Sequence, residues 1–126
     1  MQKKIIAMKN APATDAPYSP AVICGSLVFV SGQVPLDPQT GAIVPGDFEK
    51  QAEQVFQNLK LVLEESGTSL EQVVKTTAFL TSMDDLGKLN EVYKRHFPKD
   101  RPARSCVAVS GLPLGAKVEI EAIAVI

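Results

Sequence analysis

The sequence predicts an α/β domain in which a mixed sheet of six strands carries two helices on one face. The hydrophobic pattern changes along the chain in the order strands, helix, strand, helix, strand, strand. Strand–helix–strand crossovers of this length are right-handed and favour parallel neighbouring strands. With 126 residues, 45% of them hydrophobic, the chain is large enough for one domain with its own core, spanning residues 1–126.

The N-terminal part of the chain carries the signals of a strand followed by irregular structure. Residues 4–8 form a short apolar run that fits a first strand. The stretch that follows contains Pro12, Pro17 and Pro20. Because proline lacks a backbone N–H and clashes inside a helix, we expect no helix here.

Two tight turns are expected next. The β-rich runs 22–24 and 27–30 flank the dipeptide Gly25-Ser26. This dipeptide is typical of a two-residue hairpin, because glycine supplies the positive φ of a type II′ turn. Residues 37–41, Asp-Pro-Gln-Thr-Gly, have the composition of a second turn between two short apolar runs.

Both helices have recognisable ends. Residues 47–66 carry apolar side chains at helical spacing, with Asp47 as the expected N-cap and Gly67 as the residue just past the C-terminus. Ser82 begins a segment that resembles a capping box, and a narrower apolar stripe follows it until Pro98. We therefore expect a long first helix and a shorter second one.

The remaining strands are expected at 73–80, 103–109 and 117–126. The last of these, like 27–30, is apolar at both parities, which is typical of strands buried on two sides. Two helices cover only one face of such a sheet, and a chain of this length has no third layer. The second face is therefore expected to be buried by other copies of the chain.

Charge and composition exclude several classes of function. Thirteen basic and fourteen acidic residues give a net charge of −1, which provides no attraction toward a nucleic acid or an anionic membrane. No apolar stretch approaches the roughly 18 residues of a membrane span. The short apolar run after Lys4 does not fit a secretory signal. With only Cys24 and Cys106, we expect a cytoplasmic protein with reduced thiols.

The chain has a single histidine, His96. Metal sites and Ser–His or Cys–His catalysis normally depend on histidine, so no metal is expected. His96 falls near the end of the second helix, where a positive charge is mildly favourable, and is assigned no catalytic role. An enzyme of this composition must use arginine, glutamate, backbone amides and water.

Two of the expected strands carry charged or reactive side chains. Arg104 and Cys106 are two residues apart and therefore share a face, as do Glu119 and Glu121 on the last strand. A guanidinium is rarely buried without an anion. Two interpretations remain open. Arg104 pairs with Glu119 or with a carboxylate of a neighbouring subunit, or it holds a substrate carboxylate through two charge-assisted hydrogen bonds.

Five segments, in order over nearly the whole chain, resemble the RidA family, the YjgF-type reactive-intermediate deaminases. They are Ala16-Pro17-Tyr18-Ser19, Ser31-Gly32-Gln33-Val34-Pro35, Asn90-Glu91-Val92-Tyr93, Arg101 to Cys106 and Val118 to Ala124. The resemblance implies a chorismate-mutase-like fold, a homotrimer with ligand clefts between subunits, and no cofactor. It implies hydrolysis of imine and enamine carboxylates released by pyridoxal-phosphate enzymes, such as 2-aminoacrylate and 2-iminobutanoate, to 2-keto acids and ammonia.

The resemblance also implies roles for individual residues. Arg104 matches the arginine that grips the substrate carboxylate, and Glu119 matches the glutamate that positions the attacking water. Tyr18 matches the tyrosine that closes the cleft. Glu121, on the same strand face as Glu119, is expected to be a structural partner only.

Four further residues are implied at the substrate. Ser31 and Gly32 match a loop whose backbone lies against the ligand, where glycine permits close approach. Cys106 matches the cysteine of the family's Arg-Ser-Cys motif, whose backbone amide faces the ligand, and is expected among the catalytic and substrate-binding residues. The alternative is that Cys106 is a small buried hydrophobe. Asn90 matches a ligand-binding asparagine, and its alternative is a hydrogen bond between helices or subunits.

Two other functions are weighed against hydrolysis. The first is a non-catalytic trimer that binds small carboxylates or partner proteins as a regulator or chaperone. The second is cleavage of single-stranded RNA, an activity attributed to relatives of the family. Against the second, the sequence has 6% aromatic residues, no basic stripe and no pair of histidines for acid–base work.

Overall fold

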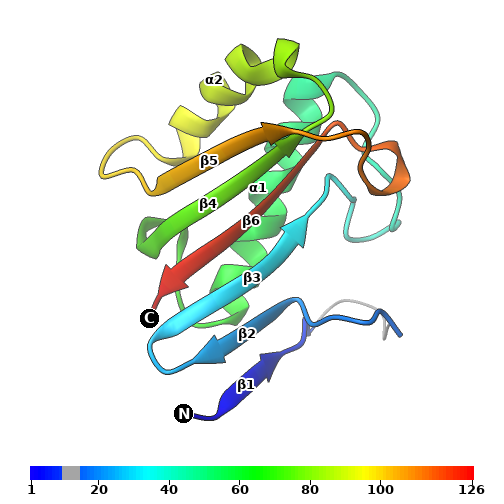
Figure 1. The fold of residues 1–126 in the computed structure, drawn as a ribbon. Helices are drawn as coiled ribbons and strands as arrows, with labels where there is room; N and C mark the ends of the chain where they lie inside the picture. Colours follow the sequence, from blue (N-terminus) through cyan, green and yellow to red (C-terminus); the bar gives the residue numbers. More distant parts are fainter. Residues whose placement is uncertain (10–14) are drawn as a thin grey trace.

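The computed structural model describes residues 1–9 and 15–126, so the expected non-helical stretch at Pro12 lies outside the described residues. One six-stranded sheet carries two helices on one face (Figure 1), and the predicted fold class is confirmed. The strands are β1 (Lys3–Ile6), β2 (Ala21–Cys24), β3 (Leu27–Gln33), β4 (Val73–Leu80), β5 (Ala103–Ala108) and β6 (Val118–Val125). The helices are α1 (Phe48–Glu65) and α2 (Leu86–His96).

The strand order is β1-β2-β3-β6-β4-β5. Strands β4 and β5, which α2 connects, are parallel neighbours, as predicted for this crossover. Strands β3 and β4, which α1 connects, are not neighbours, because β6 lies between them and pairs antiparallel with both. The expectation of adjacent strands at the first crossover is therefore wrong. The C-terminal strand, which is apolar at both parities, takes the central position.

The turns and first strand follow the sequence closely. Gly25 has a φ of +62° in the turn that joins β2 to β3, as predicted. In the second turn the Gly41 N–H donates to the Asp37 carbonyl at 2.8 Å. Strand β1 ends two residues earlier than expected, because it pairs only with the four residues of β2.

The helix ends are defined by capping. The Asp47 side chain accepts a hydrogen bond from the Lys50 N–H at 3.1 Å, and Gly67 has a φ of +83° beyond the end of α1. Both features were expected. The Ser82 hydroxyl accepts from the Asp84 N–H at 3.1 Å and so caps a short 3-10 turn that precedes α2, rather than α2 itself.

The hydrophobic core lies between the helices and one face of the sheet. Alternate residues of β6 are buried against the helices, so the residues between them point away. The core residues contributed by α1 are Phe48, Ala52, Val55, Phe56, Leu59, Val62 and Leu63. Those contributed by the two central antiparallel strands are Val28, Val30, Val118, Ile120, Ala122 and Ala124.

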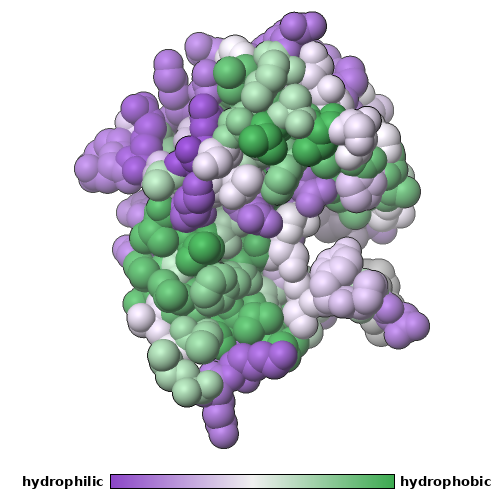
Figure 2. Space-filling view, in the orientation of Figure 1, coloured by the Kyte–Doolittle hydropathy of each residue, from purple (hydrophilic) through white to green (hydrophobic). Residues whose placement is uncertain are grey.

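The opposite face of the sheet, which we call the open face, is uncovered within the described chain. Figure 2 looks onto this face and shows a broad hydrophobic area over the lower ends of β3 and β6. Between 37% and 51% of the surface of several large apolar side chains is exposed there: Ile5, Leu27, Phe29, Val74 and Val107. The predicted lack of a third layer is therefore observed for residues 1–9 and 15–126. In the same residues, no helix is long and apolar enough to cross a membrane.

Candidate functional site

The sheet separates the predicted site residues into two groups. In β5, Arg104 pairs with the fully buried Thr76 of β4, so its side chain points toward the helices. In β6, Glu119 alternates with the fully buried Val118 and Ile120, so its carboxylate points to the open face. No ion pair joins Arg104 to Glu119 in the described part of the chain. The interpretation of an intrachain Arg104–Glu119 pair is therefore wrong.

Arg104 belongs to the helix-side group. Its guanidinium carbon lies 4.8 Å from the centroid of the Tyr93 ring on α2. The Tyr93 hydroxyl shares a hydrogen bond of 2.8 Å with the Thr76 hydroxyl, which fixes the ring. Arg104 and Asn90 line one hollow of about 240 Å³. Because no described carboxylate pairs with Arg104, its guanidinium has donors available for an anion.

Further cations surround the same hollow. Lys94 of α2 and Arg101, just before β5, both line it. The Arg101 Nε donates to the Phe97 carbonyl at 2.7 Å and its Nη2 donates to the Pro98 carbonyl at 3.3 Å. The hollow therefore has a positive rim as well as the stacked Arg104.

Of the residues that line the hollow, Tyr93, Lys94, Arg101 and Pro102 were not predicted as site residues. The Tyr93 ring packs against the Arg104 guanidinium, but in the sequence its spacing is that of the apolar core residues of α2. Its spacing of three residues from Asn90 was the available signal, because residues three apart share a helix face. Arg101 begins the Arg101 to Cys106 motif, but its position beside the hollow depends on how the chain turns after α2.

Cys106 lies on the same face of β5 as Arg104 and packs against the core. Burial raises the pKa of its thiol, and the nearby Arg104 guanidinium offsets this only in part. The thiol is therefore mostly protonated at neutral pH and is a weak nucleophile. This favours the small-hydrophobe interpretation, and a catalytic role for Cys106 stays a prediction.

Glu119 belongs to the open-face group and lies directly against Gly32. A Cβ atom built on Gly32 would overlap the Glu119 carboxylate, so the absence of a side chain there creates the space that the carboxylate occupies. A register shift between Val30 and Gln33 accompanies this contact. Burial raises the pKa of Glu119, and repulsion from Glu121 raises it further. A carboxylate with a raised pKa is better suited to accept a proton from water.

Ser31 and Tyr18 lie near the same end of β3. The Ser31 hydroxyl donates to the Ser19 carbonyl at 2.6 Å, and the Ser31 N–H donates to the Pro20 carbonyl at 3.0 Å. These bonds hold the loop that carries Tyr18, whose surface is 67% exposed. Tyr18, which is predicted to close a cleft, therefore lies on a loop held by hydrogen bonds, and most of its surface is exposed to solvent.

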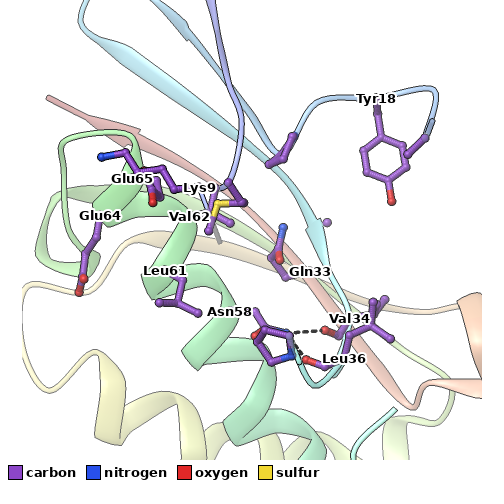
Figure 3. A pocket seen from close by; sticks show the side chains of 15 residues that line it. Lys9, Tyr18, Gln33, Val34, Leu36, Asn58, Leu61, Val62, Glu64 and Glu65 are labelled. Atoms are coloured by element: carbon purple, nitrogen blue, oxygen red, sulfur yellow. Dashed lines mark hydrogen bonds between the residues drawn. The ribbon is translucent and has the colours of Figure 1, made fainter. Parts of the chain in front are cut away.

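A wide groove of about 590 Å³ runs between this loop and α1. Tyr18 lies on one side of it, and Leu61 and Asn58 of α1 lie on the other (Figure 3). The Asn58 Nδ2 donates to the carbonyls of Val34 and Leu36 at 3.1 and 2.9 Å, which ties α1 to the segment after β3 (Figure 3). The sequence did not predict any part of α1 near the site residues.

His96 contributes to packing between the helices. Its ring stacks on Phe56 with centroids 4.6 Å apart, and its Nε2 lies 2.8 Å from a carboxylate oxygen of Glu53. Burial raises the pKa of Glu53, but the hydrogen bond from Gln57 and the contact with His96 outweigh burial, so the net shift is downward. Residues 1–9 and 15–126 contain no group of three or more His, Cys, Asp and Glu side chains placed to hold a metal ion.

Comparison with known proteins matches residues 8–126 to the family described as endoribonuclease L-PSP. A mouse protein named 2-iminobutanoate/2-iminopropanoate deaminase is 46% identical over 123 residues, covering 98% of this chain and 91% of that protein. AldR of Lactococcus lactis, named as a candidate regulator, is 44% identical over 121 residues, 96% of each chain. The crystal structure of E. coli TdcF with bound serine has 44% identity and a TM-score of 0.90, covering 98% of both chains.

Proposed function

This chain belongs to the endoribonuclease L-PSP family, the YjgF/RidA family that its motifs resemble, and from this membership we propose that it hydrolyses 2-imino and 2-enamino acids. One observation carries the proposal. The Arg104 guanidinium is stacked on Tyr93 and has no acidic partner among the described residues. Such a guanidinium holds a carboxylate through two parallel hydrogen bonds. The mouse deaminase and the serine bound to E. coli TdcF support a small amino-acid-derived ligand.

We further propose that the site forms between copies of the chain in a homotrimer. One copy supplies Arg104 and Asn90, and its neighbour supplies Glu119, Gly32 and Tyr18. Two features support this arrangement: Arg104 and Glu119 point to opposite faces of one sheet, and the open face exposes large apolar side chains. The count of three subunits comes from the resemblance to RidA-type proteins.

The proposed reaction needs only water as a co-reactant. The substrate carboxylate binds Arg104, and C2 faces a water held by Glu119. The water oxygen forms a bond to C2 while the π electrons of the C=N bond move to nitrogen. Glu119 accepts a proton from the water and transfers it to this nitrogen. In the carbinolamine the hydroxyl proton passes to the amino nitrogen, the C–N bond breaks as the C=O bond forms, and ammonia and a 2-keto acid are released. Arg104 stays protonated throughout, so most of the acceleration comes from positioning.

The test generates 2-iminobutanoate in place with a threonine dehydratase and follows 2-oxobutanoate and ammonia. We expect their rate of appearance to rise in proportion to the amount of this protein, because imine hydrolysis becomes the catalysed step. A regulator of the kind that the name AldR suggests would bind 2-oxobutanoate saturably but leave the imine lifetime unchanged. That combination would contradict the deaminase proposal and favour the regulator.

Cleavage of RNA, which the family description suggests, is less well supported. The chain has a net charge of −1 and one histidine. That histidine, His96, is stacked on Phe56 and contacts Glu53. Acid–base cleavage at a 2′-hydroxyl would have to proceed without a histidine pair or a basic groove.

Glu119 is expected to determine the acid side of the pH profile. Its pKa is raised by burial and by Glu121, and it must be ionised to accept a proton from water. As pH falls through this raised pKa, kcat/KM should therefore decline at a higher pH than for an ordinary glutamate. Glu119→Gln should lower kcat/KM about 100-fold and remove this decline, because the amide does not titrate.

Glu121→Gln is the matched control for the pH profile. It removes the neighbouring negative charge, so the pKa of Glu119 and the acid decline should both move to lower pH. The profiles are measured as kcat/KM over a range of pH, with the imine generated in place by an excess of the dehydratase. An acid decline that persists unchanged in Glu119→Gln would show that another group accepts the proton.

A further inference from the structure

The hollow around Arg104 holds more positive charge than one carboxylate requires. Its volume of about 240 Å³ suits a small metabolite. It is lined by Asn90, Tyr93, Lys94, Arg101, Pro102 and Arg104, a set with three cations and no acid. In the proposed assembly the carboxylate of a monocarboxylic imine and the neighbour's Glu119 bring two negative charges against these three cations, so one positive charge remains for a second anionic group of the substrate.

Arg101 is already held in place for such a role. Two of its N–H groups donate to the carbonyls of Phe97 and Pro98, just after α2. A guanidinium has five N–H donors, so three are left to bind a ligand. Because the side chain is ordered before binding, less rotamer freedom is lost when it contacts a second carboxylate.

The positive charge of the hollow is not neutralised within the described chain. Arg95, next to Lys94, has a carboxylate oxygen of Glu53 at 3.8 Å. Neither Lys94 nor Arg101 forms such a pair, although Glu91 lies one helical turn before Lys94. Each of the three cations that line the hollow therefore lacks an acidic partner among the described residues, as the lysines elsewhere on the surface also do.

We propose that this site prefers 2-imino dicarboxylic acids of four or five carbons, an inference that rests on the deaminase function proposed above. The 2-carboxylate binds Arg104, and the side-chain carboxylate binds Arg101 with help from Lys94. The reaction is the same hydrolysis. Water oxygen bonds to C2, the C–N bond breaks, ammonia leaves, and a 2-keto dicarboxylic acid is released.

The kinetic test compares imines made in place by amino-acid oxidases from aspartate, glutamate and alanine, in the presence of catalase. We expect kcat/KM for the two diacid imines to exceed that for 2-iminopropanoate at low salt, and the ratio to fall as salt rises. Arg101→Gln should lower this ratio about tenfold, as for loss of one charge-assisted hydrogen bond, and Lys94→Gln should lower it less. Lys99→Gln is the matched control, because Lys99 is exposed but does not line the hollow.

A binding measurement separates this proposal from the deaminase function. By calorimetry, 2-oxoglutarate should bind more tightly than 2-oxobutanoate, and Arg101→Gln should remove the difference. If both keto acids bind equally and the imine ratio is the same in Arg101→Gln, the diacid preference is overturned while the deaminase function stands. If no imine is hydrolysed faster but 2-oxoglutarate binds more tightly through Arg101, the deaminase function fails and the diacid site stands as a binding site.

Discussion

Arg104→Ala is expected to lower kcat/KM for 2-iminobutanoate by roughly 1,000-fold, the effect of losing two charge-assisted hydrogen bonds to the substrate carboxylate. The chain should stay folded. Arg104 lies on the edge strand β5, is only partly buried, and has no acidic partner in the described residues that its removal would leave unpaired. Activity is measured in the dehydratase assay, and folding by circular dichroism and thermal unfolding.

Arg104→Lys is the matched control. Lysine keeps the charge but loses the planar fork that binds both carboxylate oxygens, so its activity should fall between those of wild type and Arg104→Ala. If Arg104→Ala retained the wild-type kcat/KM, the substrate carboxylate would have to bind elsewhere. The stacked guanidinium would then no longer support the deaminase proposal.

Phe29→Glu is expected to separate the assembly into single chains and to remove most of the activity. Phe29 is 42% exposed on the open face and lies in register between Val22 of β2 and Ile123 of β6. A carboxylate buried there in a contact between copies would cost several kcal/mol, about as much as an unpaired buried charge. In a separate chain the same carboxylate stays in water, so the fold should survive. Sedimentation equilibrium and the imine assay are run on the same sample.

Leu61→Glu provides the control for the surface tested. Leu61 is 44% exposed on α1, so the substitution makes the same chemical change at similar exposure in the other layer of the molecule. Its mass in sedimentation should match that of wild type. A Phe29→Glu protein that kept both the wild-type mass and the activity would show that the open face is not where copies meet.

Local signals explain which parts of the fold were predictable. Asp47 and Gly67 mark the two ends of α1, and the β-branched run at Val73–Leu80 coincides with β4. The position of β6 between β3 and β4 has no local signal. Apolar residues at both parities indicate that a strand is buried, but strand order depends on pairing between distant segments.

The candidate site was predictable residue by residue but not as an arrangement. Parity places Arg104 and Cys106 on one face of β5, and Glu119 and Glu121 on one face of β6. Parity does not show whether the face with Arg104 and the face with Glu119 lie on the same side of the sheet, because this depends on the pairing of β5 and β6 with β4 and on the side where the helices pack. Only the register of β4 with both neighbours shows that the two pairs point in opposite directions. Tyr93 was not predicted as a site residue, because a side chain that packs against Arg104 has the same helical spacing as a core residue.

The placement of Arg104 and Glu119 on opposite faces has a genetic consequence in the proposed assembly. Each chain lends Arg104 to one cleft and Glu119 to another, so a defect in one residue inactivates only the cleft that receives it. A chain carrying Arg104→Ala and a chain carrying Glu119→Gln would complement each other when mixed, because some clefts then receive an intact residue from both sides. In a cell that makes both normal and altered chains, a share of the clefts would keep both residues and stay active, so such defects would be recessive.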